Sequence, residues 1–440
     1  MTGIIEGVVS RVLTAEVTTN TTEELRATGF GVPKFAVIDL MIRSTATDLN
    51  TADANIKTGY GNTRVFVDGS FLASAELSLA NPGANNSSTS VGLTGFSSVT
   101  VHGMDVTESD VLIDLVDGGV DVTFGGTDIS SGAAIGYCTV RMYTGRGILN
   151  AVATNQPSNQ GTSPSLPFQP NALLAMTANY SFSGTYSFGG CDHNLNQASY
   201  GIAHLASNNK YGTVSSNTKA LHSVTYNSGF REEISFAITA FTTTGWTNTV
   251  SVESYALTTT VCVLALELED PTEFEIGLAT DTNSLSTTVE LSDPYSNVNW
   301  DTVRNCTVNV LGEVSGTTMA GLSSVTNSGT NSGWSWAAEA GDPLWSQIKG
   351  PTAGASVYVI DGEVTKNTWT STANAAGTEV SYALTAGTAV SESCVYLSWG
   401  FVETPRYNIL VGDQHTRVSL VGSAYFAEAY VGEDLITNYI

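Results

Sequence analysis

The clearest hydrophobic pattern in the chain is the run YALTTTVCVLALELED, which spans Tyr255 to Asp270. From Val261 to Leu266 every position is apolar, so both side-chain phases of an extended strand are hydrophobic. After Leu266 the positions alternate between glutamate and leucine, which indicates that one face emerges into water. The pattern predicts a central strand that is covered on both faces and that closes a domain.

A strand of the same kind, with one cysteine inside an apolar run, occurs twice more. The segment AIGYCTVRMYTG surrounds Cys138 and the segment SESCVYLSWGFVE surrounds Cys394, on either side of Cys262 in the run above. The length of a domain separates each cysteine from the next. The pattern therefore predicts that this strand closes a repeated unit.

A second landmark precedes the first two of these strands. The segments GFGVPKFAVIDLMI (Gly29 to Ile42) and LPFQPNALLAMTA (Leu166 to Ala178) both place a Phe shortly before a Pro and follow the Pro with an apolar strand. Proline has no N–H for a sheet ladder, so it fixes where a strand begins. The two landmarks predict two diverged copies of one β-module, whereas the third region shares only the closing strand.

Short alternating segments, separated by turn signals such as NPGANNSS at Asn81 to Ser88, fill the rest of the chain. They predict an all-β protein made of tandem antiparallel β-sandwich (jelly-roll-like) domains with very little helix. The Pro- and Ser-rich stretch NQPSNQGTSPSLP has the composition of a linker. We expect an N-terminal arm or strand over 1–28, sandwich modules over 29–154 and 168–270, a linker over 155–167, a Trp-rich β-domain over 271–403 and a C-terminal β-tail for packing or oligomerisation over 404–440.

Composition supports the strand prediction and narrows the class of partner. Only 13% of the 440 residues are charged, which leaves few of the Lys, Glu and Arg residues that usually cover helices. The 41 acidic and 16 basic residues give a formal net charge of −25, which repels a phosphate backbone. We expect no nucleic-acid partner, and the charge favours solubility and discourages pairing between sheet edges.

The cysteines and the N-terminal residues indicate synthesis in a cytoplasm. Five cysteines without close spacing suggest neither a disulfide framework nor a zinc site. The start of the chain has no basic segment followed by a long apolar one, and no apolar run reaches about 18 residues, so we expect no secretion signal and no membrane insertion. The Thr-, Ser-, Asn- and Gly-rich texture nevertheless resembles extracellular proteins. Virion proteins combine both properties, because they are made inside cells and work outside them.

The sequence contains no motif for a serine nucleophile, a phosphate-binding loop or a metalloprotease, which favours a non-enzymatic protein without catalytic residues. Paired glutamates such as Glu267 and Glu269 suit glycoside hydrolysis in principle. Their place at the end of a core strand accounts for them without that chemistry.

One candidate metal site is a group of carboxylates in the first module. Oxygen-rich loops can hold Ca²⁺, but calcium needs about six to eight converging oxygens and the order of an EF-hand is missing. A solvated acidic edge is the preferred interpretation. The weak calcium candidates are Asp105, Glu108, Asp110, Asp114 and Asp117, with Asp121 nearby.

A second metal candidate brings thiol, carboxylate and imidazole groups together in one short segment. Cys191, Asp192, His193 and His204 are all of ligand type. Their spacing matches no known metal loop. A surface turn followed by a strand histidine is the preferred interpretation.

Three tryptophans are candidates for glycan binding or for an interface. Trp334 and Trp336 share a face if SGWSWAA is extended, and Trp345 follows after a turn. Exposed aromatic side chains of this kind stack on sugars or form interface hot spots, whereas buried ones supply core area. Because the third region holds most of the tryptophans, we expect most of them in its core.

The Phe and Pro landmarks, the closing strand at Val261 to Leu266 and the missing secretion signal together resemble β-domain virion structural proteins of tailed bacteriophages. The resemblance covers residues 29 to 270. It implies a head decoration, head fibre or tail fibre protein that is located in the virion and forms a homo-oligomer such as a trimer. It also implies contacts with other virion proteins and with host surface glycans, and no cofactor beyond the weak Ca²⁺ candidate.

Other protein classes stay open on the residues alone. A carbohydrate-binding adhesin would use the Trp-rich third region to recognise its ligand, and a surface-layer-like protein would be exported by a signal-independent route. Among virion proteins, an appendage or decoration is favoured over the main capsid shell. A shell protein usually needs a substantial helical part, and the sequence predicts almost none.

Overall fold

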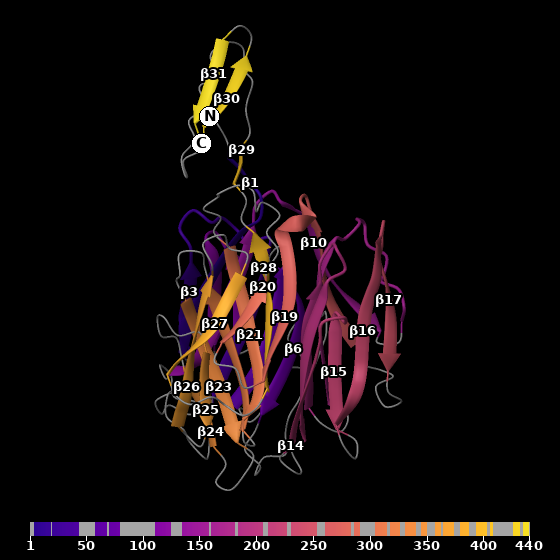
Figure 1. Ribbon diagram of the computed structural model, residues 1–440, viewed down its shortest axis with the longest axis vertical. Coiled ribbons are helices and arrows are strands. Elements are labelled where there is room, and N and C mark those ends of the chain that lie inside the picture. Colours follow the sequence, from indigo (N-terminus) through magenta and orange to yellow (C-terminus); the bar gives the residue numbers. More distant parts are fainter. Residues whose placement is uncertain are drawn as a thin grey trace.

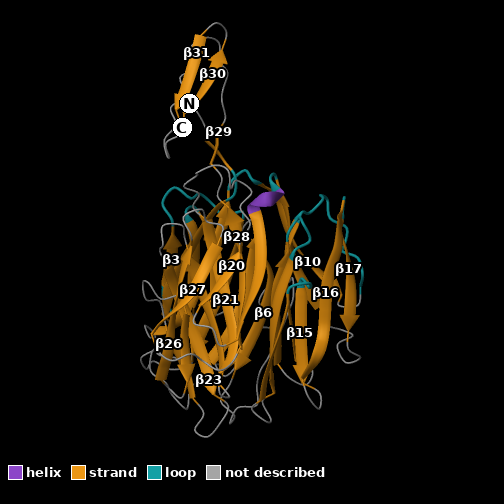
Figure 2. Cartoon of the chain, viewed as in Figure 1, coloured by secondary structure: helices purple, strands orange, loops and turns teal. Residues whose placement is uncertain are grey.

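The protein is built from antiparallel β-strands, as the computed structural model in Figures 1 and 2 shows. In the described part of the chain, the single helical element is the short 3₁₀ turn η2 (Pro271–Glu273). The predicted all-β fold with very little helix is confirmed. The structure describes residues 4–18, 20–43, 58–67, 70–79, 111–124, 134–157, 160–180, 184–205, 210–226, 230–252, 260–282, 286–290, 304–314, 317–325, 331–339, 345–349, 357–361, 364–373, 379–386, 393–402, 405–407, 426–431 and 434–439.

The first module is a sandwich of a five-stranded and a three-stranded sheet. Its strands are β2 (Val9–Thr18), β3 (Thr22–Arg26), β4 (Phe35–Arg43), β5 (Thr58–Val67), β6 (Ser70–Leu79), β7 (Val111–Val116), β8 (Gly119–Phe124) and β9 (Ala134–Thr144). The larger sheet has the order β2-β9-β4-β5-β6 and the smaller one the order β3-β8-β7. Apolar side chains from both sheets, among them Val17, Val122 and Val140, meet in one core.

The second module is a sandwich of a six-stranded and a three-stranded sheet. Its strands are β10 (Ile148–Pro157), β11 (Ala172–Tyr180), β12 (Gly184–Cys191), β13 (Gln197–Leu205), β14 (Lys210–Ser216), β15 (Leu221–Tyr226), β16 (Phe230–Thr242), β17 (Gly245–Val252) and β18 (Thr260–Leu268). The orders are β10-β18-β11-β12-β13-β14 and β15-β16-β17. The core between them contains Phe236, Trp246 and Val263.

The third module has a six-stranded and a four-stranded sheet. Its strands are β19 (Phe274–Thr282), β20 (Ser286–Glu290), β21 (Arg304–Val314), β22 (Thr317–Val325), β23 (Asn331–Glu339), β24 (Trp345–Lys349), β25 (Val357–Asp361), β26 (Val364–Ala373), β27 (Glu379–Ala386) and β28 (Ser393–Val402). The orders are β19-β28-β21-β22-β23-β24 and β20-β27-β26-β25.

The three modules share one strand topology. In each larger sheet the last strand of the module, β9, β18 or β28, lies between the first strand and the next strand of that sheet. In the smaller sheets of the first and third modules, β8 pairs with β3 and β27 pairs with β20. In the second module, Thr247 of β17 forms an isolated β-bridge with Thr162, which follows β10 in the chain as β3 follows β2 and β20 follows β19. The strands that contain Cys138, Cys262 and Cys394 therefore close their modules, and the third region has the same strand order as the second.

The larger sheets also pack against one another, through the faces that point away from their own cores. Strand β6 of the first module contacts β10, β11 and β12 of the second, β13 of the second contacts β19 and β28 of the third, and β21 of the third contacts β2 of the first. The three larger sheets therefore form a ring. This arrangement explains the apolar run of β18, because Val261 to Leu266 are buried on both faces of the strand as predicted.

Two segments lie differently from the expected boundaries. The region 1–28, expected as an arm or strand, supplies β2 and β3, which are integral strands of the first sandwich. The expected linker over 155–167 begins inside β10, because Asn155, Gln156 and Pro157 still pair with β18. Both segments pair with strands more than 90 residues away in the chain. Local composition cannot predict pairing over such a distance, so the expected boundaries differ from the observed ones.

The two ends of the chain meet outside the three modules. Strand β1 (Ile4–Glu6) pairs with β29 (Pro405–Tyr407), and β30 (Phe426–Val431) forms a hairpin with β31 (Asp434–Tyr439). Figure 1 shows this hairpin, in yellow, beyond the body of the molecule and close to both chain ends. We call β1, β29, β30 and β31 the projecting end.

Candidate functional site at the projecting end

The N-terminal segment leaves the body at a junction built from glycines. The amide of Gly147 donates to the carbonyl oxygen of Gly7 over 3.1 Å. Gly145 has φ +99°, and a Cβ at this position would lie 2.1 Å from the same oxygen. A Cβ on Gly147 would lie 2.7 Å from the amide nitrogen of Val8. Only glycines allow the connection between the first two modules to pack this closely on the departing strand.

The connection between the second and third modules reaches the same junction. The amide of Glu269 donates to the carbonyl oxygen of Gly147 over 2.8 Å. Asp270 then caps η2 by accepting hydrogen bonds from the amide and the hydroxyl of Thr272, over 3.1 and 2.6 Å. Glu273 is fully buried beside Gly147. Figure 2 shows η2, in purple, at the end of the body from which the hairpin projects.

The C-terminal segment leaves the body beside the N-terminal one. Phe401, near the end of β28, pairs with Phe274 at the start of β19, and their ring centroids are 5.1 Å apart. Four residues further on, Pro405 pairs with Glu6 across the ladder of β1 and β29. Both chain ends and both inter-module connections therefore converge at one end of the body. This geometry suits attachment to another molecule by one end.

A shared core behind this junction holds the three modules together. Phe35 stacks on Tyr143 within the first module at 4.6 Å, and Tyr143 contacts Phe401 of the third module at 4.9 Å between centroids. Phe188 of the second module and Trp399 of the third are 6.0 Å apart. The cluster is buried and aromatic, so it provides packing area rather than a binding site.

Sequence reasoning missed one residue in this core. The Arg141 guanidinium lies 4.4 Å from the centroid of the Trp399 ring and is fully buried. An arginine flanked by apolar residues in a predicted strand is a signal that was available in the sequence. The inter-module partner, Trp399, lies more than 250 residues further along the chain, so the sequence alone gave no means of pairing them.

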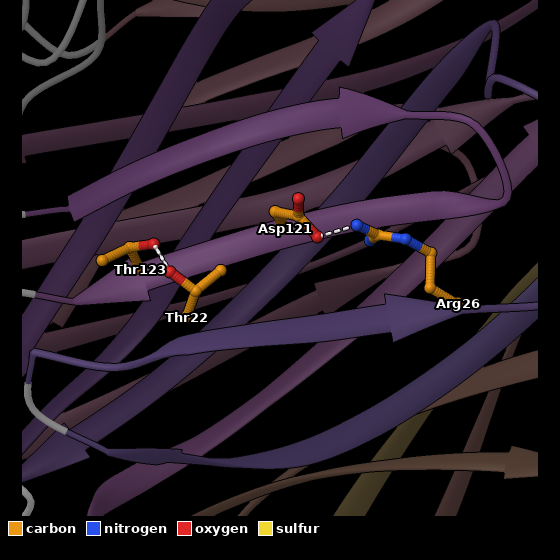
Figure 3. Close-up of polar contacts among 4 residues, drawn as sticks. All are labelled: Thr22, Arg26, Asp121 and Thr123. Atoms are coloured by element: carbon orange, nitrogen blue, oxygen red, sulfur yellow. Dashed lines mark hydrogen bonds and ion pairs between the residues drawn. The ribbon is translucent and has the colours of Figure 1, made fainter.

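The carboxylates proposed as a calcium site are only partly within the described residues. Asp114 and Asp117 are exposed. Asp121 forms an ion pair with Arg26, and Figure 3 shows this pair beside the hydrogen-bonded hydroxyls of Thr22 and Thr123. In the part of the first module that the structure describes, no three candidate ligands come together. The other candidates, Asp105, Glu108 and Asp110, lie outside the described residues.

The second metal candidate is a tightly hydrogen-bonded loop. Asp192 accepts hydrogen bonds from the amides of Asn194 and Asn196, both over 2.9 Å, and from the side-chain amide of Asn196 over 2.8 Å. The Cys191 thiol is buried and donates to the Asp192 carbonyl oxygen, and burial raises the pKa of this thiol. His193 follows in the turn and position 204 pairs with position 184 in β13 and β12. The carboxylate stabilises a turn between two strands.

The three candidate tryptophans occupy two faces of one sheet. Positions 334 and 336 are two residues apart in β23 and so share a face. Position 345 pairs with position 339, whereas position 336 pairs with position 348. Directly paired residues share a face, so Trp345 lies on the face opposite to Trp334 and Trp336. The register therefore separates position 345 from positions 334 and 336.

The glutamates at the end of β18 also have structural roles. Glu267 accepts a hydrogen bond from the side-chain amide of Asn150, its neighbour in β10. The backbone of Glu269 forms the junction hydrogen bond described above. These contacts agree with the interpretation of the pair as the edge of a core strand.

No family model matches the chain, and no curated protein is significantly similar to it. Among the described residues, no helix is long and apolar enough to cross a membrane.

Proposed function

We propose that the protein is a non-enzymatic structural component of a bacteriophage particle, of the head decoration, head fibre or tail fibre type. The observation that carries this proposal is that both chain ends leave the body of the three modules at the same end. Ile4 and Tyr407 pair in the ladder of β1 and β29, which belongs to the projecting end. Such a shape suits a protein that is fixed to a particle at one end and presents a body of packed sandwiches to the outside.

The body supports this proposal because its three modules pack into one unit. Its larger sheets bury their outer faces within one chain, around Arg141, Phe188 and Trp399. Copies that assemble into the expected homo-oligomer would therefore meet through other surfaces of the body. The net charge of −25 keeps such a body soluble outside a cell.

The test is the composition of purified virions whose genome encodes this chain. We expect tryptic peptides of the protein in gradient-purified particles at a fixed ratio to the major shell protein. Immunogold labelling should place residues of the three modules further from the particle surface than the projecting end. A protein found in the infected lysate but absent from the particles would refute the proposal.

A second candidate function is glycan binding as an adhesin. It rests on Trp334 and Trp336, which share one face of β23. The test is binding of the purified protein to an array of bacterial surface glycans. Loss of binding in a W334A/W336A variant, with binding retained in W345A on the opposite face, would favour this function. Equal binding by all variants, or none by the wild type, would exclude it.

A further inference from the structure

The hairpin of the projecting end is a sheet of only two strands. Within the described residues, β30 and β31 pair with each other and with nothing else, from Phe426 opposite Tyr439 to Val431 opposite Asp434. Gly432 and Glu433 alone connect the strands. Among the described residues, each strand therefore has one edge whose backbone N–H and C=O groups pair with no other strand. An isolated two-stranded hairpin is at best marginally stable in water.

The register of the hairpin separates its residues into two unlike faces. Phe426, Tyr430, Leu435 and Tyr439 occupy positions on one face, together with Glu428 and Thr437. The other face carries small and aliphatic residues at most positions, such as Ala429 and Ile436. Aromatic and aliphatic positions at this density on a sheet of two strands are typical of a surface that another protein covers.

The charge of the hairpin indicates what kind of protein covers it. From Phe426 to Ile440 the chain has three acidic residues, Glu428, Glu433 and Asp434, and no basic one. The whole chain is also strongly acidic, at −25. Two copies of the hairpin would repel each other, whereas a basic surface would attract it. Charge thus disfavours a second copy of this chain as the partner.

We propose that the hairpin is a docking element that adds its open strand edge to a β-sheet edge of a different virion protein, and that lysines or arginines flank this edge. Backbone hydrogen bonds across the new ladder provide affinity, and the aromatic face and the three acids provide specificity. The inference rests on the proposed function, because it names the partner that would fix the protein to the particle.

The test is complementation of a phage from which the gene for this protein has been deleted. The infected cells supply either the wild-type chain, an E428K/E433K/D434K variant or a D114K/D117K variant, and the copies per purified particle are counted by mass spectrometry. The second variant is the matched control, because Asp114 and Asp117 are exposed acids of the body. We expect the hairpin variant to be incorporated about tenfold less than the wild type, and the control to be incorporated normally.

Each outcome separates the two proposals. Normal incorporation of the hairpin variant, with the wild type present in particles, would overturn the docking element and leave the proposed function intact. Absence of the wild type from particles would overturn both. Circular dichroism and thermal unfolding of the purified variants show whether the body still folds.

A second measurement does not depend on any variant. Washing wild-type particles at about 1 M salt should release more of the protein than washing at about 0.1 M salt, because the attraction between an acidic hairpin and a basic edge is screened at the higher ionic strength. Equal release at both salt concentrations would contradict the charge-based choice of partner. Light scattering of the free protein tests the remaining alternative, which is that the hairpin binds a second copy of this chain. A wild-type oligomer that dissociates in the E428K/E433K/D434K variant would support that alternative.

Discussion

The guanidinium of Arg141 in the first module lies over the indole ring of Trp399 in the third, 4.4 Å from the ring centroid. Both residues are fully buried, on strands that close their modules. A cation on an aromatic face is worth more when water is excluded. This pair therefore links the first and third modules at the centre of the ring of larger sheets.

Replacement of Arg141 should destabilise the protein. We expect R141A to lower the free energy of unfolding by about 3 kcal/mol, because it removes buried packing and the contact with Trp399. R141K keeps the charge without the planar group and should have an intermediate effect. Urea unfolding measures both. R146A, at an exposed position of the next turn, is the control and should change stability by less than about 0.5 kcal/mol. Equal stability of R141A and R146A would contradict the role of the pair.

The junction glycines make a second prediction. Gly145 and Gly31 both have positive φ, +99° and +80°, but only Gly145 has backbone within 4 Å of its ideal Cβ, at Gly7. G31A should cost about 1 kcal/mol from backbone strain alone. G145A should cost at least about 2 kcal/mol, because the segment at Gly7 must also move. Thermal unfolding of both variants measures the difference in lost stability. Equal losses in G31A and G145A would mean that the backbone at Gly7 moves aside at no cost.

Because the thiols of Cys191 and Cys262 are buried, we expect them to react slowly with alkylating reagents, and we expect the stability of the protein to depend on pH. Burial raises the pKa of Cys262 from 9.0 to about 12, and its thiol donates to the Asn155 side chain over 2.8 Å. The unfolded thiol loses its proton above pH 9, whereas the folded one retains it. Its contribution to stability is therefore complete below pH 9 and is lost as the pH rises toward 12.

Alkylation kinetics check the thiol prediction directly. At pH 8, iodoacetamide should label Cys191 and Cys262 quickly in guanidinium chloride and very slowly in the native protein, with each site followed by mass spectrometry. Rapid labelling of either residue in the native state would show that the strands around it open readily.

The acidic edge of the first module allows a test against the calcium interpretation. Asp114 lies directly opposite Asp121 in the pair of β7 and β8. Like charges at such positions are destabilising, so D114T should raise the free energy of unfolding by about 0.5 kcal/mol. D117T, in the turn, is the control and should have little effect. If added Ca²⁺ stabilised the wild type and D114T removed this response, the calcium interpretation would replace ours.

The sequence by itself determined the elements and their class. The period-two segments, the apolar run of β18 and the Phe30 and Phe168 landmarks ahead of β4 and β11 identify real strands and core residues. These features are local, because a strand that is covered on both faces must be apolar in both phases. The third module shows the limit of this information. Its strand order matches that of the second, although its sequence repeats only the closing strand.

Only the tertiary structure decided which face each strand presents to which neighbour. Cys138 points into the core of its own sandwich, whereas Cys262 lies outside the corresponding core and contacts Asn155. Cys138 and Cys262 therefore lie in equivalent strands but on different faces of them. The same holds for the junction and for Arg141 with Trp399, since their partners come from other modules. Sequence periodicity records that a side chain is covered, and long-range packing determines what covers it.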